Sequence, residues 1–156
     1  MRTTPVLSLL LAMVALLSVN ANGQESSEPQ TDSVVTPNAI LESDAKHNFE
    51  VAKWSFDARK AYKAVIMRFD ETYAAYPIFS KMDEFYYIAA MSCLNLKDGK
   101  GSQRLDYSRM SAEEKERFSK ERLGEDAKLF LETIVEKYPK SRYFKDAKKS
   151  LLSLAR

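Results

Sequence analysis

Two Tyr-Pro steps constrain the fold of this chain more than any other feature of its sequence. Tyr76-Pro77 and Tyr138-Pro139 each end an amphipathic run of helical length. Proline stops a helix because it lacks the backbone N–H that an interior residue donates and because its ring clashes with the preceding turn. The two steps therefore predict two helices that end in the same way, as expected for a helical repeat protein.

The residues before each proline match at fixed offsets. Val65 and Ala127 lie twelve positions before the two prolines, and Phe69 and Leu131 lie eight positions before them. This small-then-large pattern, closed by proline, resembles the second helix of a tetratricopeptide repeat. We therefore predict an all-α fold of tetratricopeptide-like helical hairpins, with two repeats plus a capping helix in a short α-solenoid. Such a fold favours a binding surface over a catalytic pocket.

Apolar residues at helical spacing place the expected helices. The first is expected to begin at Ser43 and the second to run from Ala61 to Tyr76, with a turn at residues 57–60. The third is expected after 80–83, a capping signature in which the Ser80 hydroxyl would accept from a free N–H, and to end near Lys97. The residues expected to face the core are Ala45, Phe49, Ala52, Phe56, Val65, Phe69, Phe85, Ala89, Cys93, Ala127, Leu131, Ile134, Ala147 and Leu151.

The segment 98–125 is predicted to be an insertion within the second repeat. The two Tyr-Pro steps lie 62 residues apart, which exceeds the tetratricopeptide period of about 34 residues by about 28. Ser111-Ala112-Glu113-Glu114 predicts the start of a helix there. The insertion is expected either to extend the following helix or to lie against the groove. Its Gly99-Lys100-Gly101 lacks the spacing of a phosphate-binding loop.

The N-terminal part of the sequence predicts export. Arg2 precedes an apolar stretch, Val6 to Val19, and small residues near Ala21 suit a signal-peptidase site. We therefore predict a signal peptide at 1–23, a flexible polar linker at 24–42, and a helical domain at 43–156. No lipobox cysteine follows the apolar stretch, so the expected location is the periplasm, with a membrane tether only if the signal stays uncleaved.

The chain offers little for catalysis or metal binding. It has one cysteine, Cys93, expected to be a small buried hydrophobe, and one histidine, His47, expected to be exposed. We predict no catalytic residues, no metal ligands and no cofactor. A formal net charge of +2 gives no argument for nucleic acid. The basic last segment, 140–156, suits a solvated helix end, and a docking surface for an acidic partner or anionic headgroups is the second interpretation.

Aromatic residues are concentrated between residues 54 and 87. Most are expected in the core. Trp54, Phe79 and Tyr87 lie off the main apolar stripes, so they are candidates for lining a peptide groove.

The first predicted hairpin resembles a specific family. His47-Asn48-Phe49-Glu50-Val51-Ala52-Lys53-Trp54, then Ala61-Tyr62-Lys63-Ala64-Val65-Ile66-Met67-Arg68, then Tyr76-Pro77 are similar to the C-terminal repeats of the outer-membrane-protein assembly lipoprotein BamD. The tail from Tyr138 to Ala147 also resembles that family's repeat ending. The resemblance covers about residues 44–97 and 125–155. Other periplasmic repeat proteins, such as the cell-division coordinator family, share the Tyr-Pro-x-Ser ending.

The resemblance implies a non-enzymatic scaffold that contacts the barrel-inserting subunit of the outer-membrane assembly machine. In the family, the arginine of the helix before Tyr-Pro belongs to the partner-facing region, and Arg68 occupies that place here. We expect Arg68 to be the charged anchor, with Trp54 and Tyr62 as aromatic contacts. The alternative for Arg68 is a surface side chain that lies over Tyr73 or pairs with a nearby acid. The family's lipidated cysteine is absent, and the resemblance includes only the C-terminal repeats.

Two other function classes stay open from the sequence. A periplasmic oligomerisation or cell-division module would use the same repeats for self-association or for regulation of cell-wall enzymes. An enzyme is the third class, and a metal or cofactor in the purified protein would favour it. Association with the outer membrane follows from the BamD resemblance as an expectation.

Overall fold

The computed structural model describes residues 37–155 of the chain, with side chains from Asn38 onward. The predicted signal peptide and most of the predicted linker lie outside this part. The described residues are all-helical and contain no strand, so the predicted all-α class is confirmed. The elements are α1 (Pro37–Trp54), a π-helical turn η1 (Ser55–Arg59), α2 (Tyr62–Ala75), α3 (Met82–Lys97), a 3₁₀ turn η2 (Tyr107–Arg109), α4 (Ala112–Arg117), α5 (Lys120–Lys137) and α6 (Phe144–Leu154).

The first helix is longer at its start than predicted. It begins at Pro37 rather than Ser43, so residues 37–42 are helical and the predicted end of the linker at residue 42 is wrong. Proline is well suited to the first position of a helix, where its missing N–H has no intrahelical partner to lose. The polar composition around Ser43 obscured this start.

The predicted turn between α1 and α2 is confirmed, although it is built without glycine. A π-helical turn at Ser55–Arg59 loosens the end of α1, and the N–H of Ala61 donates to the carbonyl of Ser55 at 2.9 Å. Lys60 then takes a left-handed conformation with a φ of 52°, which is uncommon for a residue with a side chain. The chain can therefore reverse direction and begin α2 at Tyr62.

The predicted cap of α3 is wrong. Lys81 rather than Ser80 occupies the N-cap, and no side chain caps the helix. The backbone N–H of Ser80 donates instead to the Glu42 carboxylate at 3.3 Å. The loop before α3 is therefore held by Glu42 of α1 and not by the local cap that the sequence predicted.

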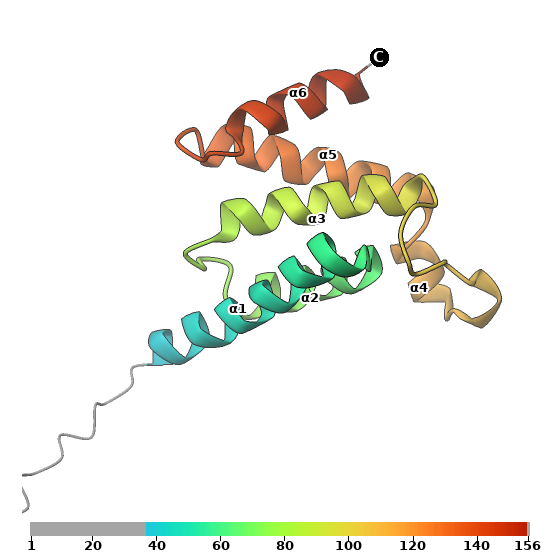
Figure 1. Cartoon of the computed structure of the whole chain (residues 1–156), viewed down its shortest axis with the longest axis horizontal. Helices are drawn as coiled ribbons and strands as arrows, with labels where there is room; N and C mark the ends of the chain where they lie inside the picture. Colours follow the sequence, from blue (N-terminus) through green and yellow to red (C-terminus); the bar gives the residue numbers. More distant parts are fainter. Residues whose placement is uncertain (1–36, 156) are drawn as a thin grey trace, which may run out of the picture. The chain divides into compact units, whose positions relative to one another are not determined.

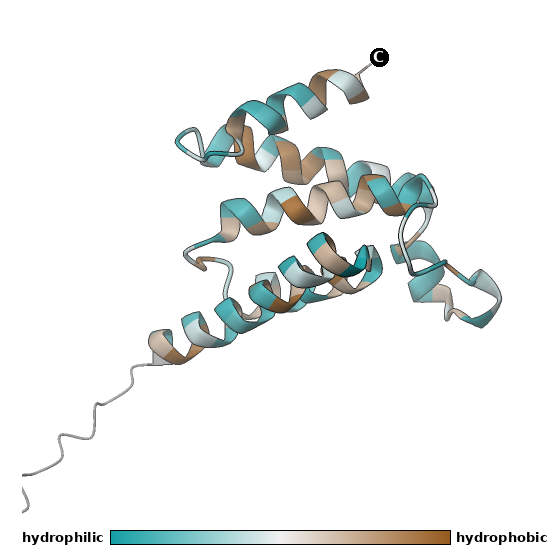
Figure 2. Ribbon diagram, in the orientation of Figure 1, coloured by the Kyte–Doolittle hydropathy of each residue, from teal (hydrophilic) through white to brown (hydrophobic). Residues whose placement is uncertain are grey.

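The helices pack in chain order, α1 on α2, α2 on α3, α3 on α5 and α5 on α6 (Figure 1). Successive long helices run in opposite directions, and the two Tyr-Pro turns lie at the same end of the stack (Figure 1). Figure 2 shows apolar residues gathered where α3 and α5 face each other. The predicted packing positions Val65, Phe69, Ala127 and Leu131 are all buried. Close approach of the helices is helped by fully buried alanines, which are Ala52, Ala89, Ala90, Ala127 and Ala147.

The predicted insertion divides into two parts. Residues 120–125 extend the following helix, because α5 already begins at Lys120. Residues 98–119 fold back toward the start of α2 and contain the predicted capping box, in which the Ser111 hydroxyl accepts from the N–H of Glu114 at 3.1 Å and the Glu114 carboxylate accepts from the N–H of Ser111 at 3.2 Å. The helix that this box begins, α4, is only six residues long.

The folded-back segment is fastened by ion pairs over long sequence separations. The Arg117 guanidinium donates to both carboxylate oxygens of Asp70 of α2, with three N–O distances of 2.8 to 3.0 Å, and makes a fourth contact to the buried Asp126 of α5 at 2.6 Å. Lys63 of α2 pairs with Glu114 at 3.1 Å.

Among residues 37–155, none of the helices is long and apolar enough to cross a membrane.

Candidate partner-binding surface

Arg68 lies on α2 at the seam with α1. Its guanidinium donates to the side-chain carbonyl of Asn48 at 2.9 Å and to the carboxylate of Glu71 at 3.1 Å. Tyr73 stacks on Phe69 instead, with ring centroids 5.9 Å apart. Of the two surface alternatives for Arg68, the structure therefore contains pairing with a nearby acid, and the side chain stays partly open to solvent.

Trp54 ends α1 with most of its ring exposed. Two residues of helix turn about 200°, so Trp54 points away from the side on which Ala52 is fully buried. Its exposed fraction is 56%. The Arg59 guanidinium lies 5.1 Å from the ring centroid, close enough for a cation–π contact. The side chain predicted to be an aromatic contact is therefore accessible.

Tyr62 does not lie on the surface as predicted. Its exposed fraction is 8%, and its ring packs edge-on against Phe56 at 5.7 Å. The other cover comes from the folded-back segment, because the backbone of Gly101 lies directly against the ring. Tyr62 is a core residue, and the expectation of a partner contact there is wrong.

The remaining candidates for an aromatic groove are also engaged within the domain. Phe79 is buried and its ring lies 5.8 Å from that of Phe49. Tyr87 is partly buried and stacks on Tyr143 at 4.6 Å. Of the three residues off the main stripes, only Trp54 remains broadly exposed.

Trp54 of α1 and Met67 of α2 are both exposed, each on the side of its helix that is turned away from the buried residues. Met67 lies two residues after the buried Val65 and, by the same helical geometry, points outward with an exposed fraction of 48%. Between Met67 and Trp54 lies the seam where Arg68 meets Asn48. Arg68 and Trp54 are not in direct contact, because six residues along α1, about 9 Å of helix rise, separate Asn48 from Trp54. We call this side the outer α1–α2 face, made of Asn48, Val51, Trp54, Met67, Arg68 and Glu71.

Another side of α1 is linked to α3 by an ion pair. Glu84 of α3 accepts from Arg142 at 2.7 Å and lies 3.6 Å from the ammonium of Lys53 on α1. Burial, together with Glu84, raises the pKa of the neighbouring Tyr143 to about 12. This Glu84 bridge (Lys53, Glu84 and Arg142) ties α1 and the α5–α6 turn to α3, so its charges are used internally.

The basic last helix presents its lysines to solvent. Lys145, Lys148 and Lys149 are exposed, while Ala147 is buried against the rest of the domain. Arg156 lies outside the described residues. The amphipathic arrangement suits a helix that packs on one side only, and the lysine face remains a second candidate surface for an anionic partner.

The side chains that could act in catalysis or bind a metal are, within residues 37–155, buried, paired or not grouped together. Cys93 is fully buried, and burial raises the pKa of its thiol to about 12, which leaves little reactive thiolate. His47 is exposed, as predicted. Within residues 37–155, no three His, Cys, Asp or Glu side chains are grouped so that they could hold a metal ion. Burial raises the pKa of Asp70, and the hydrogen bonds from Arg117 oppose that rise.

Comparison of the chain with protein-family models, with curated proteins and with solved structures found no match.

Proposed function

We propose that this chain is a tetratricopeptide-like adaptor of the cell envelope that binds a protein partner through the outer α1–α2 face. The observation that carries the proposal is the exposure of Trp54 and Met67 on either side of the Arg68 seam. The BamD-like motifs suggest the partner class, which is the barrel-inserting subunit of the outer-membrane assembly machine. The exported location belongs to the same proposal.

The packing order supports the tetratricopeptide part of the proposal. The long helices contact their neighbours in chain order, as stacked hairpins do. The small and large positions that defined the repeat, Val65 and Phe69 in α2 and Ala127 and Leu131 in α5, are buried in both helices. In a stacked array, each helical pair exposes a face on which a neighbouring pair packs. In the first pair of this stack, that exposed face is the outer α1–α2 face.

The composition of that face suits a protein interface. Tryptophan and arginine dominate binding energy at many interfaces, especially where they pack beside apolar neighbours. Asn48 and Glu71 hold the Arg68 guanidinium in place before a partner arrives, which lowers the entropy cost of ordering it. A partner acid near Arg68 and an apolar side chain between Trp54 and Met67 would complete this surface.

Site-specific photocrosslinking in living cells tests the proposal. A photoreactive residue at position 54 or 67 is expected to capture the barrel-inserting subunit, whereas one at Glu136, exposed on α5, serves as the matched control. Capture of division or cell-wall proteins from 54 and 67 would favour the cell-division alternative. Capture of a second copy of this chain would assign the face to an oligomer, and equal capture from 136 would remove the assignment of this face.

A further inference from the structure

The last helix, α6, lies at one edge of the helical stack and packs mainly against α5 (Figure 1). Ala147 is fully buried on the side that faces the domain, and Leu151, one turn later, is partly buried there. The first helices, α1 and α2, lie at the opposite edge of the stack (Figure 1). The side of α6 that is turned away from the domain is therefore separate from the outer α1–α2 face.

Three lysines and one leucine share that side of α6. Successive residues of an α-helix are rotated by about 100°, so a residue lies beside those three, four and seven positions before it. For Leu152 these neighbours are Lys149, Lys148 and Lys145, and all three are exposed. Leu152 itself has an exposed fraction of 63%. We call these four residues the outward face of α6.

The helix dipole does not account for these lysines. A positive charge is favoured near the C-terminus of a helix and disfavoured near its N-terminus. Lys145 is the second residue of α6, and the last turn of the helix contains no basic residue. The lysines lie in the first half of α6, so their own helix does not stabilise their charge.

The acids near α6 leave the outward face positive. The one acid within α6, Asp146, lies three positions before Lys149. Burial, followed by the charge of Asp146, raises the pKa of Tyr87 on α3, which places this carboxylate toward α3. The ion pairs that the structure describes around α5 and α6 use other cations, which are Arg117, Arg122, Lys128 and Arg142. Three lysines against one acid give this helix a net positive charge.

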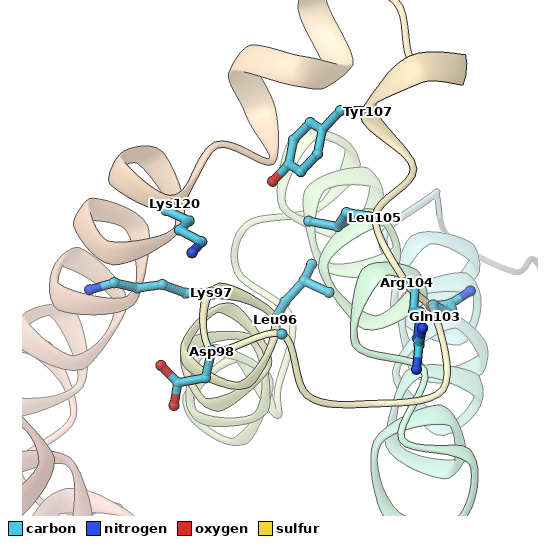
Figure 3. A pocket seen from close by; sticks show the side chains of 9 residues that line it. Leu96, Lys97, Asp98, Gln103, Arg104, Leu105, Tyr107 and Lys120 are labelled. Carbon is cyan, nitrogen blue, oxygen red and sulfur yellow. The ribbon is translucent and has the colours of Figure 1, made fainter.

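The basic side chains around the cavity at the end of α3 are arranged differently. That cavity has a volume of about 620 Å³, and Lys97, Arg104 and Lys120 are among the residues that line it. Figure 3 shows the Lys97 ammonium turned away toward α5 and Arg104 across the cavity from Lys120. The cations of the cavity therefore do not converge, whereas those of α6 project from neighbouring positions of one helix.

The chemistry of the outward face favours a flat anionic surface over an acidic protein. Its cations are all lysines, which act as flexible point charges, whereas arginine is the residue that fixes a carboxylate through paired hydrogen bonds. The apolar stems of lysines can lie along hydrocarbon while the ammonium groups stay in the polar layer. Leu152, between the lysines, supplies an apolar side chain of the kind that enters the boundary between headgroups and acyl chains.

We propose that the outward face of α6 docks the domain on an anionic phospholipid surface. The three ammonium groups lie among the headgroup phosphates, and Leu152 enters the boundary below them. Each lysine near an anionic leaflet strengthens binding by about fivefold. Three lysines and one leucine therefore give weak, reversible docking that salt screens. The proposal does not depend on the partner-binding function.

Sedimentation of the full chain with vesicles tests the proposal. Vesicles of phosphatidylglycerol and phosphatidylcholine are expected to bind the chain more tightly than vesicles of phosphatidylcholine alone, which measure any binding that needs no anionic lipid. Lys148→Gln and Lys149→Gln are each expected to weaken binding to the anionic vesicles by about fivefold. Leu152→Ser is expected to weaken it by about threefold, because part of the apolar contact is lost.

Two matched variants change the same kinds of side chain elsewhere. Lys46→Gln removes an exposed lysine of α1, at the other edge of the stack, and Ile78→Ser removes an apolar side chain with an exposed fraction of 73%. Both are expected to leave binding to the anionic vesicles unchanged. Circular dichroism of each variant checks that the helices remain.

Three results would overturn the proposal. The first is equal binding to anionic and neutral vesicles. The second is equal weakening by Lys46→Gln and Lys148→Gln, because the attraction would then be a property of net charge. The third is binding of soluble polyglutamate that Lys148→Gln weakens, together with vesicle binding that Leu152→Ser leaves unchanged, which would assign the face to an acidic protein.

Discussion

The two sides of α2 differ in how they are covered. On one side, residues 98–119 lie against the helix, with Arg117 bound to Asp70 and Lys63 bound to Glu114. On the other, Arg68 meets only Asn48 of α1 and Glu71 of α2 itself, and the neighbouring Met67 is exposed. Both sides carry charged residues, so charge alone does not tell them apart. The difference is that one side contacts distant parts of the chain, whereas on the other side Met67 and Arg68 remain partly exposed.

The largest effect on the covered side of α2 is expected from removal of the Arg117 side chain. Arg117→Ala would leave the buried Asp126 with Arg122 as its remaining cation and would leave Asp70 without its bidentate partner. Loss of one cation from this network leaves the buried Asp126 less fully compensated, so we expect a loss of about 3 kcal/mol in the free energy of unfolding. Urea denaturation measures it. Arg117→Lys, which keeps the charge but not the planar fork, should lose less, whereas a loss below that of Arg68→Ala would contradict the assigned role of Arg117.

Gly101 provides the next largest effect, because it allows the covering segment to approach α2. It has a φ of 101°, and a Cβ there would lie 2.5 Å from the carbonyl oxygen of Lys60. Gly101→Ala should therefore displace the segment and cost about 2 kcal/mol. Its matched control is Gly99→Ala, with a φ of 70° and open space around the added Cβ, which should cost about 1 kcal/mol. Limited proteolysis within 98–119 should accelerate for the first variant more than for the second, and equal rates would argue against close packing at 101.

Substitution of Trp54 tests the exposed side of the first helix pair. Trp54→Ala should change the free energy of unfolding by less than about 0.5 kcal/mol, because the ring is mostly exposed. Binding of the captured partner should weaken by about 2 kcal/mol if the ring is a central contact. Ile78→Ala, which removes another exposed apolar side chain at 73% exposure, is the control and should affect neither quantity. A strongly destabilised Trp54→Ala with normal partner affinity would show that the ring serves the fold and not the interface.

The sequence predicted the parts of the fold that depend on local pattern. Helical spacing and the Tyr-Pro steps placed α2 and α5, and their packing positions Val65 and Ala127 are fully buried. The capping box at Ser111 was predicted because its two partners lie three residues apart. Rules of this kind depend only on residues that lie within about one helical turn of each other, so they can be applied to a single sequence.

Contacts between distant residues were not predictable in the same way. Tyr62 was expected at the surface because nothing in its own helix indicates that residues 98–119 cover it. The N–H of Ser80 likewise has a distant partner, the carboxylate of Glu42, 38 residues earlier, which no local capping rule indicates. Arg117 and Asp70 are 47 residues apart, and neither is distinguished from other surface charges in the sequence. The exposure of Trp54 follows from its helical phase and could be predicted from the sequence, whereas the burial of Tyr62 depends on residues 98–119 and could not.

Glu114 gives the smallest and most local test of the covered side. Hydrogen bonds from Lys63 and from the N–H of Ser111 lower the pKa of its carboxylate below the ordinary value. Because the folded-state pKa is the lower one, the stabilisation is present above the ordinary glutamate pKa and is lost as the pH falls through the folded-state value, below that ordinary pKa. NMR titration should therefore show the amides of Ser111 and Glu114 shifting together in that range. Glu114→Gln should remove this coupled shift while leaving the cap from the Ser111 hydroxyl. Persistence of the shift in Glu114→Gln would mean that another acid titrates there and that the Lys63 pair does not fasten α4 to α2.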